Sequence, residues 1–347
     1  MLPRMEERVQ SVSPPRLAAL VRDIFARCGM SEAHAALVAD VLVWAELRGM
    51  GSHGVMRVPR YVELIRKGDL NVRPDIRPAL ETAACVLLDA DRAAGPVAMM
   101  EAARAACDKA RASGIGLALV RETTHTAALG YYTQSAAREG FAAIALAASS
   151  PLMAYHGARA AGVSTAPLSI AVPGEDEPLA LDMASSVVSM GALAQARASG
   201  AALAEGAALA ADGSPTTDSR AASIPLPLGG PKGSGLALMS ECLASLLTAN
   251  PILAEALERT PASKRHRQNG LVIAIDVARF ITPERFREEV RRLVSALRKL
   301  PAAPGAEILM PGERGQRNAA RQRDALPVPT KLYEELKALA ERLPARE

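Results

Sequence analysis

The sequence contains few aromatic residues and nearly balanced charges. Only 3% of its 347 residues are aromatic, with a single Trp, so side chains able to stack on nucleic-acid bases are scarce. This composition argues against a nucleic-acid-binding protein. The 41 basic and 37 acidic residues leave a net charge of only +4, so charge by itself identifies no partner.

Cysteine pairs and long apolar runs are also absent. Cys28, Cys85, Cys107 and Cys242 lie far apart, form no C-x-x-C pair and have no histidine at zinc-site spacing. The sequence therefore predicts neither a disulfide framework nor a metal site. Residues 1–16 lack the apolar segment of a signal peptide, and no apolar run reaches the roughly 18 residues that a membrane span needs. We expect a cytoplasmic protein that does not enter a membrane.

Apolar residues recur with helical spacing at the start of the chain, whereas short apolar strands alternate with helices from Cys85 onward. This alternation predicts an α/β layer architecture. The Ala- and Gly-rich residues 191–213 give no clear pattern. The expected helices are 14–28, 32–48, 55–67, 95–112, 127–138, 235–249, 283–299 and 329–343. The expected strands are 85–90, 115–120, 141–147, 168–173, 178–183 and 270–276.

Gly49, Gly51 and Gly54 spell G-x-G-x-x-G, which in a dinucleotide-binding turn follows a strand and precedes a helix. Here helical patterns lie on both sides, so the Rossmann interpretation fails. What remains is Ser52-His53 on a tight turn between helices. A catalytic histidine and a solvated loop histidine both fit this pattern.

Three further polar residues lie beside expected element ends. His125 precedes a helix expected to begin at Ala127, and Asp182 ends a strand at a position typical of a helix N-cap. Lys232 lies between glycines at the head of a helix, where it could hold a phosphate. The stretch is not a P-loop, because Pro231 stands where that motif needs Gly.

A Ser-His-Asp hydrolase is one use of such residues. However, the chain has no G-x-S-x-G elbow, and Ser52 and His53 are sequence neighbours. We expect a hydrogen bond between two adjacent side chains to be awkward, which argues against a hydrolase.

The ordered set of motifs is more informative than any one of them. It comprises RGMGSHGVMRVPRYVELIRKGDLN, THTAALGYYTQSAA, SSPLMA, LDMASS, DGSPTTD, GGPKGSGLAL, GLVIAID and MPGERG. In this order and spacing, over about residues 15–340, the chain resembles the malate/L-lactate dehydrogenase family. That family includes ureidoglycolate, sulfolactate and diketogulonate dehydrogenases and reductases of piperideine- and pyrroline-2-carboxylate. The resemblance implies an α/β, non-Rossmann, sulfolactate-dehydrogenase-like fold and a homodimer.

The helix and strand patterns, together with the resemblance, lead us to expect two regions. These are a helical N-terminal unit at residues 1–78, packed with the C-terminal helices of residues 283–347, and an α/β cofactor-binding region at residues 79–282. The SHG motif lies in the helical unit.

By the same resemblance, His53 exchanges a proton with the substrate, while Ser52 and Asp182 align or polarise it. Arg57, placed one helical turn beyond His53, holds the substrate carboxylate with its planar guanidinium. Thr165 is the further substrate-binding residue.

The implied cofactor is NAD or NADP. The residues that match cofactor-binding positions are His125, Thr126, Ala127, Ala128, Leu129, Met183, Ala184, Lys232, Gly233, Pro311, Gly312, Glu313 and Arg314.

The chain departs from the family at three places. It has AYHGAR where the family has aPhGG, and it lacks the Pro-Gly-Trp element expected before the DG turn. The third departure is a loop. Where the family usually has G-T-N-P, this sequence has Ser164 and Ala166 in place of Gly and Asn. The leading interpretation is an oxidoreductase that moves a hydride between nicotinamide and a small 2-hydroxy or 2-oxo acid. Reduction of a cyclic imine carboxylate is the alternative within the family. A diverged binding protein without turnover is the alternative from another class.

Overall fold

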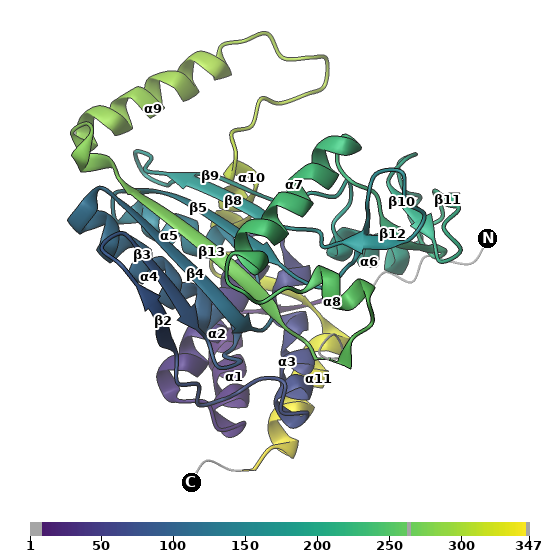
Figure 1. Cartoon of the computed structure of the whole chain (residues 1–347). Helices are drawn as coiled ribbons and strands as arrows, with labels where there is room; N and C mark the ends of the chain where they lie inside the picture. The colour runs from purple at the N-terminus through teal and green to yellow at the C-terminus, as the bar shows by residue number, and fades with distance from the viewer. Residues whose placement is uncertain (1–8, 262–264, 345–347) are drawn as a thin grey trace. The chain divides into compact units, whose positions relative to one another are not determined.

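The computed structural model describes residues 9–261 and 265–344, and its chain forms two compact units. The first unit comprises Met1–Arg73 and Arg314–Glu347, and the second comprises Pro74–Glu313. The first unit is thus assembled from both ends of the chain. Figure 1 shows the elements of both units.

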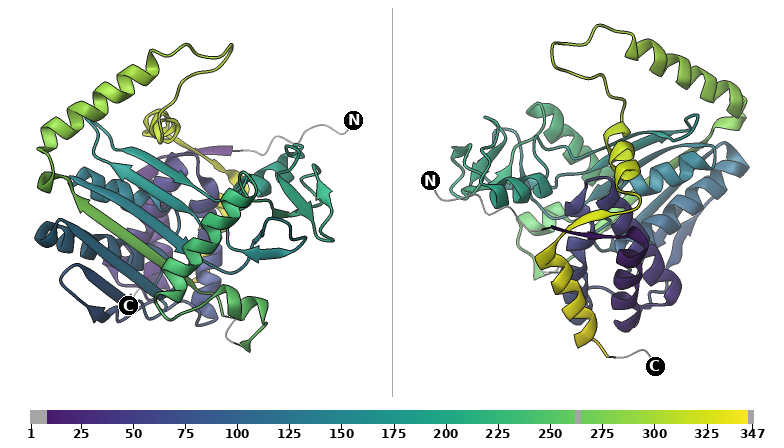
Figure 2. Two further views of the ribbon diagram at one scale, coloured as in Figure 1. Left: turned by 45° about the horizontal axis from the view of Figure 1, so that its top comes forward. Right: turned by 180° about the vertical axis from the view of Figure 1, so that it is seen from behind.

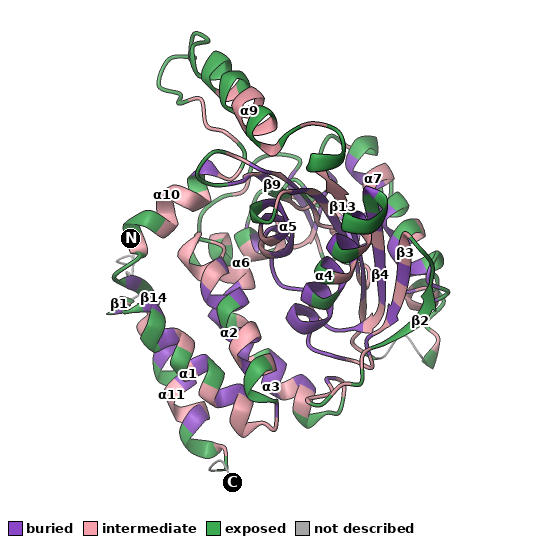
Figure 3. Ribbon diagram, turned by 90° about the vertical axis from the view of Figure 1, so that its left-hand side faces the viewer, coloured by how far each residue is buried: buried purple, intermediate pink, exposed green. Residues whose placement is uncertain are grey.

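The first unit is helical apart from a two-stranded sheet. Strand β1 pairs antiparallel with β14, with Val9 opposite Pro329 and Val12 opposite Leu326 (Figure 3). The described elements of this unit are β1 (Val9–Val12), α1 (Pro14–Arg27), α2 (Glu32–Leu47), the short helices η1 (Gly51–His53) and η2 (Val55–Arg57), α3 (Val58–Arg66), β14 (Leu326–Pro329) and α11 (Thr330–Arg342). Helix α10 (Glu313–Gln322) begins at the boundary between the units.

The second unit is built on a seven-stranded sheet of order β2-β3-β4-β13-β5-β8-β9. Within the described residues, only β3 and β4 pair in parallel, and the other neighbours are antiparallel. A dinucleotide-binding Rossmann sheet is mostly parallel, so the expected non-Rossmann architecture is confirmed. The strands are β2 (Arg77–Glu81), β3 (Cys85–Asp89), β4 (Ile115–Thr123), β5 (Phe141–Ala148), β8 (Leu168–Val172), β9 (Leu179–Met183) and β13 (Gln268–Asp276).

Helices cover both faces of this sheet (Figures 1 and 2). Helix α4 (Gly95–Ser113) packs so closely that a Cβ on Gly116 of β4 would lie 2.0 Å from the Ala106 carbonyl oxygen. Helix α5 (Gly130–Arg138) packs on β5 and β8. The opposite face carries α7 (Pro231–Glu241) and the π-helical turn η3 (Cys242–Leu246). On that face Leu119 and Leu271 form one apolar cluster with Ala244 of η3.

The remaining elements of the second unit are short, apart from two helices. Helix α6 occupies part of the stretch that gave no sequence pattern. Helix α9 follows η5 and has no buried residue (Figure 3). These elements are β6 (Met153–Ala154), β7 (Ala161–Val163), α6 (Met190–Ser199), β10 (Ala208–Ala210), β11 (Pro215–Thr216), β12 (Ala222–Pro225), α8 (Leu253–Leu257), η5 (Val277–Arg279) and α9 (Pro283–Arg298).

Several expected boundaries need correction. Helix α5 begins at Gly130 rather than 127, because Ala127 adopts φ +55°, outside the helical region. Helix α7 begins four residues earlier than expected, with Pro231 at its first position. Helix α9 clusters with the second unit, not with the first as expected for residues 283–347. It continues from β13 through η5, and its Arg291 pairs with Glu175.

Candidate active site

The predicted histidine lies on a tight turn in the first unit. His53 ends η1, and its backbone N–H donates to the Met50 carbonyl over 2.8 Å. Its Nδ1 and the Ser52 hydroxyl oxygen are 3.0 Å apart, a hydrogen-bonding distance. The expectation that this bond between adjacent side chains would be awkward was therefore wrong. Because Ser52 can donate or accept, it orients the imidazole in either tautomer.

Arg57 lies on the same turn, although not through the single helix expected from its spacing. His53 belongs to η1 and Arg57 to η2, and Gly54 between them has an extended conformation. The Arg57 Nε donates to the Ser52 carbonyl over 2.5 Å, so the guanidinium folds back over the turn. That bond uses one of its five N–H donors.

The electrostatics of this turn favour a neutral histidine. Burial and the nearby Arg57 charge lower the pKa of His53 from 6.5 to about 4. Burial also lowers the pKa of Arg57, and Tyr61 partly opposes this effect. Within residues 9–261 and 265–344, Arg57 forms no ion pair with a carboxylate. A half-buried guanidinium is therefore placed where an anionic ligand would compensate its charge.

The predicted residues of the second unit gather around the end of β9. Asp182 lies within β9 and does not cap a following helix, so its expected N-cap position was wrong. Its Oδ2 instead accepts the backbone N–H of Gly130, the first residue of α5, over 2.8 Å. A Cβ on Gly130 would lie 2.7 Å from that oxygen. This contact joins Asp182 to the segment that carries His125, Thr126, Ala127, Ala128 and Leu129.

Protein atoms around Asp182 disfavour its charged form. Desolvation raises the pKa of its carboxyl from 3.8 to about 6, and the bond from Gly130 opposes the rise. The residue nevertheless keeps an exposed surface. Asp182 thus combines a perturbed pKa with access from solvent, a combination frequent at functional sites.

The 125–129 segment is held by several hydrogen bonds. The backbone N–H of Thr126 donates to Gln268 over 3.1 Å, and the buried Tyr132 hydroxyl donates to the Thr126 carbonyl over 2.6 Å. A Cβ on Gly95 would lie 2.1 Å from the His125 carbonyl oxygen, so α4 begins directly against this segment. His125 lies five residues before α5, not at its N-terminus as expected.

Three other predicted segments contact β9 or the residues that follow Met183 and Ala184. The Thr165 carbonyl accepts from both the backbone N–H and the hydroxyl of Ser185, each over 2.8 Å. Gly233, beside Lys232 in α7, leaves no room for a Cβ, which would lie 2.4 Å from the Ser185 carbonyl oxygen. The Pro311 carbonyl accepts from the Ala180 N–H over 3.3 Å, with Gly312 alongside. We call residues 180–185, together with Thr165, Lys232, Gly233, Pro311 and Gly312, the β9 cluster.

Two predicted residues at the start of α10, Glu313 and Arg314, differ in burial and in their contacts. Glu313 is buried, accepts the Met310 N–H over 2.9 Å and pairs with Arg298 over 3.2 Å, so it closes the loop before α10. Arg314 is exposed and belongs to the first unit. Lys232 is also exposed, as the second residue of α7.

The altered loop turns one side chain inward. Ala166 has φ +31° and is fully buried in an apolar cluster with Met153, Val163, Ala237 and Leu253. The Ser164 hydroxyl accepts the Ala166 N–H over 3.2 Å. At this position the chain therefore contributes a methyl group to the core.

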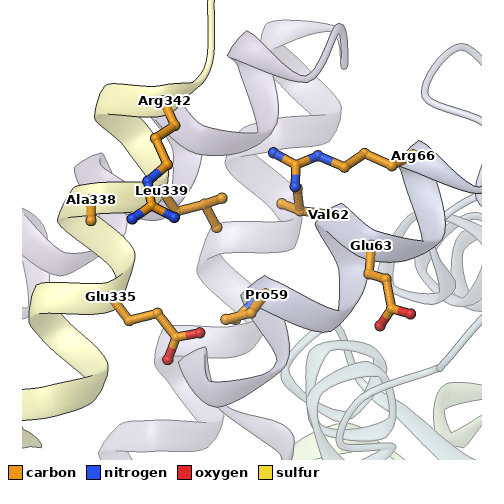
Figure 4. Close-up of a pocket in the computed structure, with 8 residues that line it drawn as sticks. All are labelled: Pro59, Val62, Glu63, Arg66, Glu335, Ala338, Leu339 and Arg342. Carbon is orange, nitrogen blue, oxygen red and sulfur yellow. The ribbon is translucent and has the colours of Figure 1, made fainter.

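A groove in the first unit contains none of the predicted residues (Figure 4). It lies between α3, with Glu63 and Arg66, and α11, with Glu335 and Arg342. Glu63 pairs with Arg60 and Lys67 on its own helix, and burial does not isolate these charges from water. The groove therefore gives no sign of a reactive site.

Two negative findings concern the described residues. Between residues 9 and 344, apart from 262–264, no three His, Cys, Asp or Glu side chains are grouped to hold a metal ion. Over the same ranges, no helix combines the length and the apolar character required to cross a membrane.

The chain resembles known proteins over most of its length. Residues 12–337 match the family model described as malate/L-lactate dehydrogenase. Ureidoglycolate dehydrogenase (NAD(+)) of Escherichia coli K12 is 35% identical, with 87% of each chain covered. A Pseudomonas putida Delta(1)-pyrroline-2-carboxylate/Delta(1)-piperideine-2-carboxylate reductase is 33% identical, with 87% of this chain and 88% of the reductase covered.

The fold agrees as well. The solved structure of sulfolactate dehydrogenase from Methanocaldococcus jannaschii has a TM-score of 0.86 at 32% identity, covering 96% of this chain and 97% of that one. The expected sulfolactate-dehydrogenase-like fold is thereby confirmed. With a family match over most of its length and this agreement in fold, the chain belongs to the malate/L-lactate dehydrogenase family of oxidoreductases.

Proposed function

We propose that the protein transfers a hydride between NAD or NADP and a small 2-hydroxy or 2-oxo acid. The observation that carries this proposal is the turn at residues 52–57. There, a half-buried Arg57 without a carboxylate partner among the described residues lies beside a histidine held neutral. Arg57 suits the carboxylate of a small acid, and His53 suits the proton of its hydroxyl group.

The proposed proton transfer follows from the state of His53. With Nδ1–H donating to Ser52, the Nε2 lone pair accepts the hydroxyl proton while the hydride leaves the substrate carbon. For His53 to keep this proton as an imidazolium, its pKa must rise above the lowered value of about 4. A bound carboxylate offsets the Arg57 charge that lowers the His53 pKa. Substrate binding should therefore raise the His53 pKa and favour the imidazolium.

Asp182 is the second proposed contributor. Surrounding protein atoms raise the pKa of its carboxyl, and in its ionised form that carboxyl would favour an imidazolium at His53. We therefore propose that Asp182 contributes to the same reaction as His53, as the family resemblance implies. A double substitution at His53 and Asp182 should then lower kcat by less than the product of the single effects.

The β9 cluster has features that fit a nicotinamide cofactor. Lys232 is exposed at the start of the 11-residue helix α7, where backbone N–H groups and a cation favour phosphate. The hydroxyl of Ser186, adjacent to the cluster, is buried without a hydrogen-bond partner among the described residues. When bound, the cofactor supplies the hydride acceptor or donor. The ureidoglycolate relative is named for NAD(+), whereas this chain's preference between NAD and NADP is a question for the assay.

The decisive experiment is a panel of 2-oxo acids and cyclic imine carboxylates, followed at the nicotinamide absorbance with NADH and with NADPH. His53→Ala should retain cofactor binding and lower kcat by about 10² to 10⁴. Nearly intact turnover by His53→Ala would contradict the role of this residue. Cofactor binding without turnover of any substrate would favour the non-catalytic alternative.

The second candidate function is reduction of a cyclic imine carboxylate. It uses the same carboxylate clamp but delivers the proton to nitrogen, and one relative carries a name of this kind. The altered loop gives a reason to test this function. Ala166 stands where the family usually has Asn, and its methyl group lies in the core, so the loop offers no polar side chain at this position. A higher kcat/KM for cyclic imines than for open-chain oxo acids would select this function.

We also propose that the protein is a homodimer. Phe286, Val290, Leu293, Leu297 and Leu300 follow i, i+4, i+7 spacing along and just beyond α9. Leu293 and Leu300 are 57% and 56% exposed, so this stripe lacks a partner within the described part of the chain. A second copy is the partner that the family resemblance implies. Replacing Leu293 and Leu297 by Asp should shift the mass measured by light scattering from dimer to monomer.

A further inference from the structure

A carboxylate that sequence reasoning did not select lies against the turn that carries His53. Glu46 is the last acidic residue of α2, and its Oε2 accepts the backbone N–H of Val55 over 3.0 Å. Val55 begins η2, where the first N–H groups of a helix lack an intrahelical acceptor. Glu46 therefore caps the short helix that bears Arg57.

The two glycines of the SHG turn are fitted to this carboxylate. A Cβ on Gly54 would lie 2.0 Å from Glu46 Oε2, and a Cβ on Gly51 would lie 3.2 Å from Oε1. Each carboxylate oxygen thus contacts the backbone at one end of the Ser52-His53 pair. Neither glycine has a positive φ, so close approach, and not an unusual backbone angle, explains both.

Glu46 occupies this position at an electrostatic cost. Desolvation raises the pKa of its carboxyl, and the hydrogen bond from Val55 opposes the rise. Within residues 9–261 and 265–344, no Lys or Arg forms an ion pair with it. Burying half of an acidic side chain that has only a backbone N–H as its hydrogen-bond donor costs free energy, which points to a role in shaping the turn.

The other end of the turn is fixed as well. The Arg57 Nε bonds to the Ser52 carbonyl, and Val55 and Val58 are fully buried. Loss of Glu46 would release the segment between these anchors, which contains His53. The position of His53 Nε2, the proposed proton-transfer atom, would then vary. The proposed cofactor-binding residues of the second unit would keep their own contacts.

We propose that Glu46 is a positioning residue, which clamps the Gly51–Val55 turn and so presents His53 and Arg57 to the substrate. The inference rests on the proposed function for its catalytic consequence but not for the clamp itself. A misplacement of about 1 Å in a reacting group can cost about 100-fold in rate. Glu46→Ala should therefore lower kcat by about 10- to 100-fold. Cofactor affinity should be unchanged.

The test combines hydrogen exchange of the unliganded protein with kinetics. Glu46→Ala should speed amide exchange in the peptide covering residues 51–57 and lower kcat. Glu46→Gln keeps an oxygen that can accept the Val55 N–H, so it should restore slow exchange and most of the activity. Asp40→Ala, an exposed acid on the same helix, is the matched control and should change neither.

A second pair of variants keeps the test independent of a folding failure. Gly54→Ala should disrupt the turn because its methyl group collides with the Glu46 carboxylate. Removal of that carboxylate leaves only the Cβ of residue 46, 3.3 Å from the new methyl group, so the loss in Glu46→Ala/Gly54→Ala should be much smaller than the sum of the two single losses. Additive losses in the double variant would overturn the clamp.

The outcomes separate this inference from the proposed function. Unchanged exchange in Glu46→Ala would overturn the clamp, whatever His53→Ala shows. Faster exchange with unchanged kcat would overturn the claim that the clamp serves catalysis, and a fully active His53→Ala would then trace the failure to the proposed function. Faster exchange, a lower kcat and rescue by Glu46→Gln would together support the clamp.

Discussion

Substitution of His53 by Gln should make the protein more resistant to acid. Burial and Arg57 lower the pKa of His53 from 6.5 to about 4 in the folded protein. Between these pH values the unfolded chain binds a proton at His53 that the folded protein does not bind. The stability of the wild type should therefore fall relative to His53→Gln as the pH drops from 6.5 toward 4.

The magnitude follows from the gap between the two pKa values. Each pH unit in this window changes the relative free energy of unfolding by about 1.4 kcal/mol. The difference between wild type and variant should shift by about 2 kcal/mol at pH 5 and by about 3 kcal/mol over the whole window. From about one pH unit above 6.5 the difference should be constant, because both states then hold a neutral imidazole.

Urea unfolding measured at several pH values tests this expectation. The single tryptophan, Trp44, lies on α2 of the first unit, so its fluorescence reports on the unit that contains His53. His156→Gln, which removes an exposed histidine, is the control and should not reproduce the shift. A difference between wild type and His53→Gln that is the same at pH 5 as at neutral pH would refute the reasoning. Binding of an anionic substrate analogue should reduce the shift, because it compensates Arg57.

Three further predictions concern the other site residues. Arg57→Lys should raise KM for a carboxylate substrate and Arg57→Met should raise it further, because Lys cannot reproduce the planar fork; a neutral ketone turned over as well as the acid would contradict this role. Lys232→Met should raise the cofactor Kd in fluorescence titrations more than it lowers saturated turnover, and an unchanged Kd would make Lys232 an ordinary surface residue. Asp182→Asn should raise the Tm relative to wild type above pH 6 and lose this advantage below pH 3.8, since the raised pKa of about 6 marks a charge that the fold disfavours. A gain in Tm that is equally large in acid would contradict that assignment.

The sequence predicted the long elements well because their periodicity is strong. Helices α1, α2 and α9 and the core of the sheet lie within a few residues of their expected positions. Boundaries failed where one residue departs from the pattern, as at Ala127 with its positive φ. Strand β1 was not predicted, because four residues beside a helix carry little signal until β14 pairs with them.

The sequence selected residues for the candidate site but did not predict the contacts that these residues make. Asp182 was expected to cap its own following segment, yet it accepts the N–H of Gly130, 52 residues away. Glu46 similarly caps η2 from α2. Local sequence rules recognise a cap only beside its own helix, so both carboxylates look ordinary in the sequence. The only sequence feature that could have drawn attention to Glu46 is its acidic side chain two residues before the stretch R-G-M-G-S-H-G.

The first unit is interrupted in the chain, and this has a consequence for biosynthesis. Pro74–Glu313 is one continuous segment. Strand β1 of the first unit, in contrast, cannot pair until β14 has been synthesised, more than 300 residues later. The second unit can therefore fold on the ribosome while the first half of the other unit is still incomplete. Gly49, just before the histidine turn, also packs against Asn318 of α10. The turn that carries Ser52 and His53 is thus completed only after nearly the whole chain has been synthesised, so a prematurely terminated chain could contain a folded second unit but no finished Ser52-His53 turn.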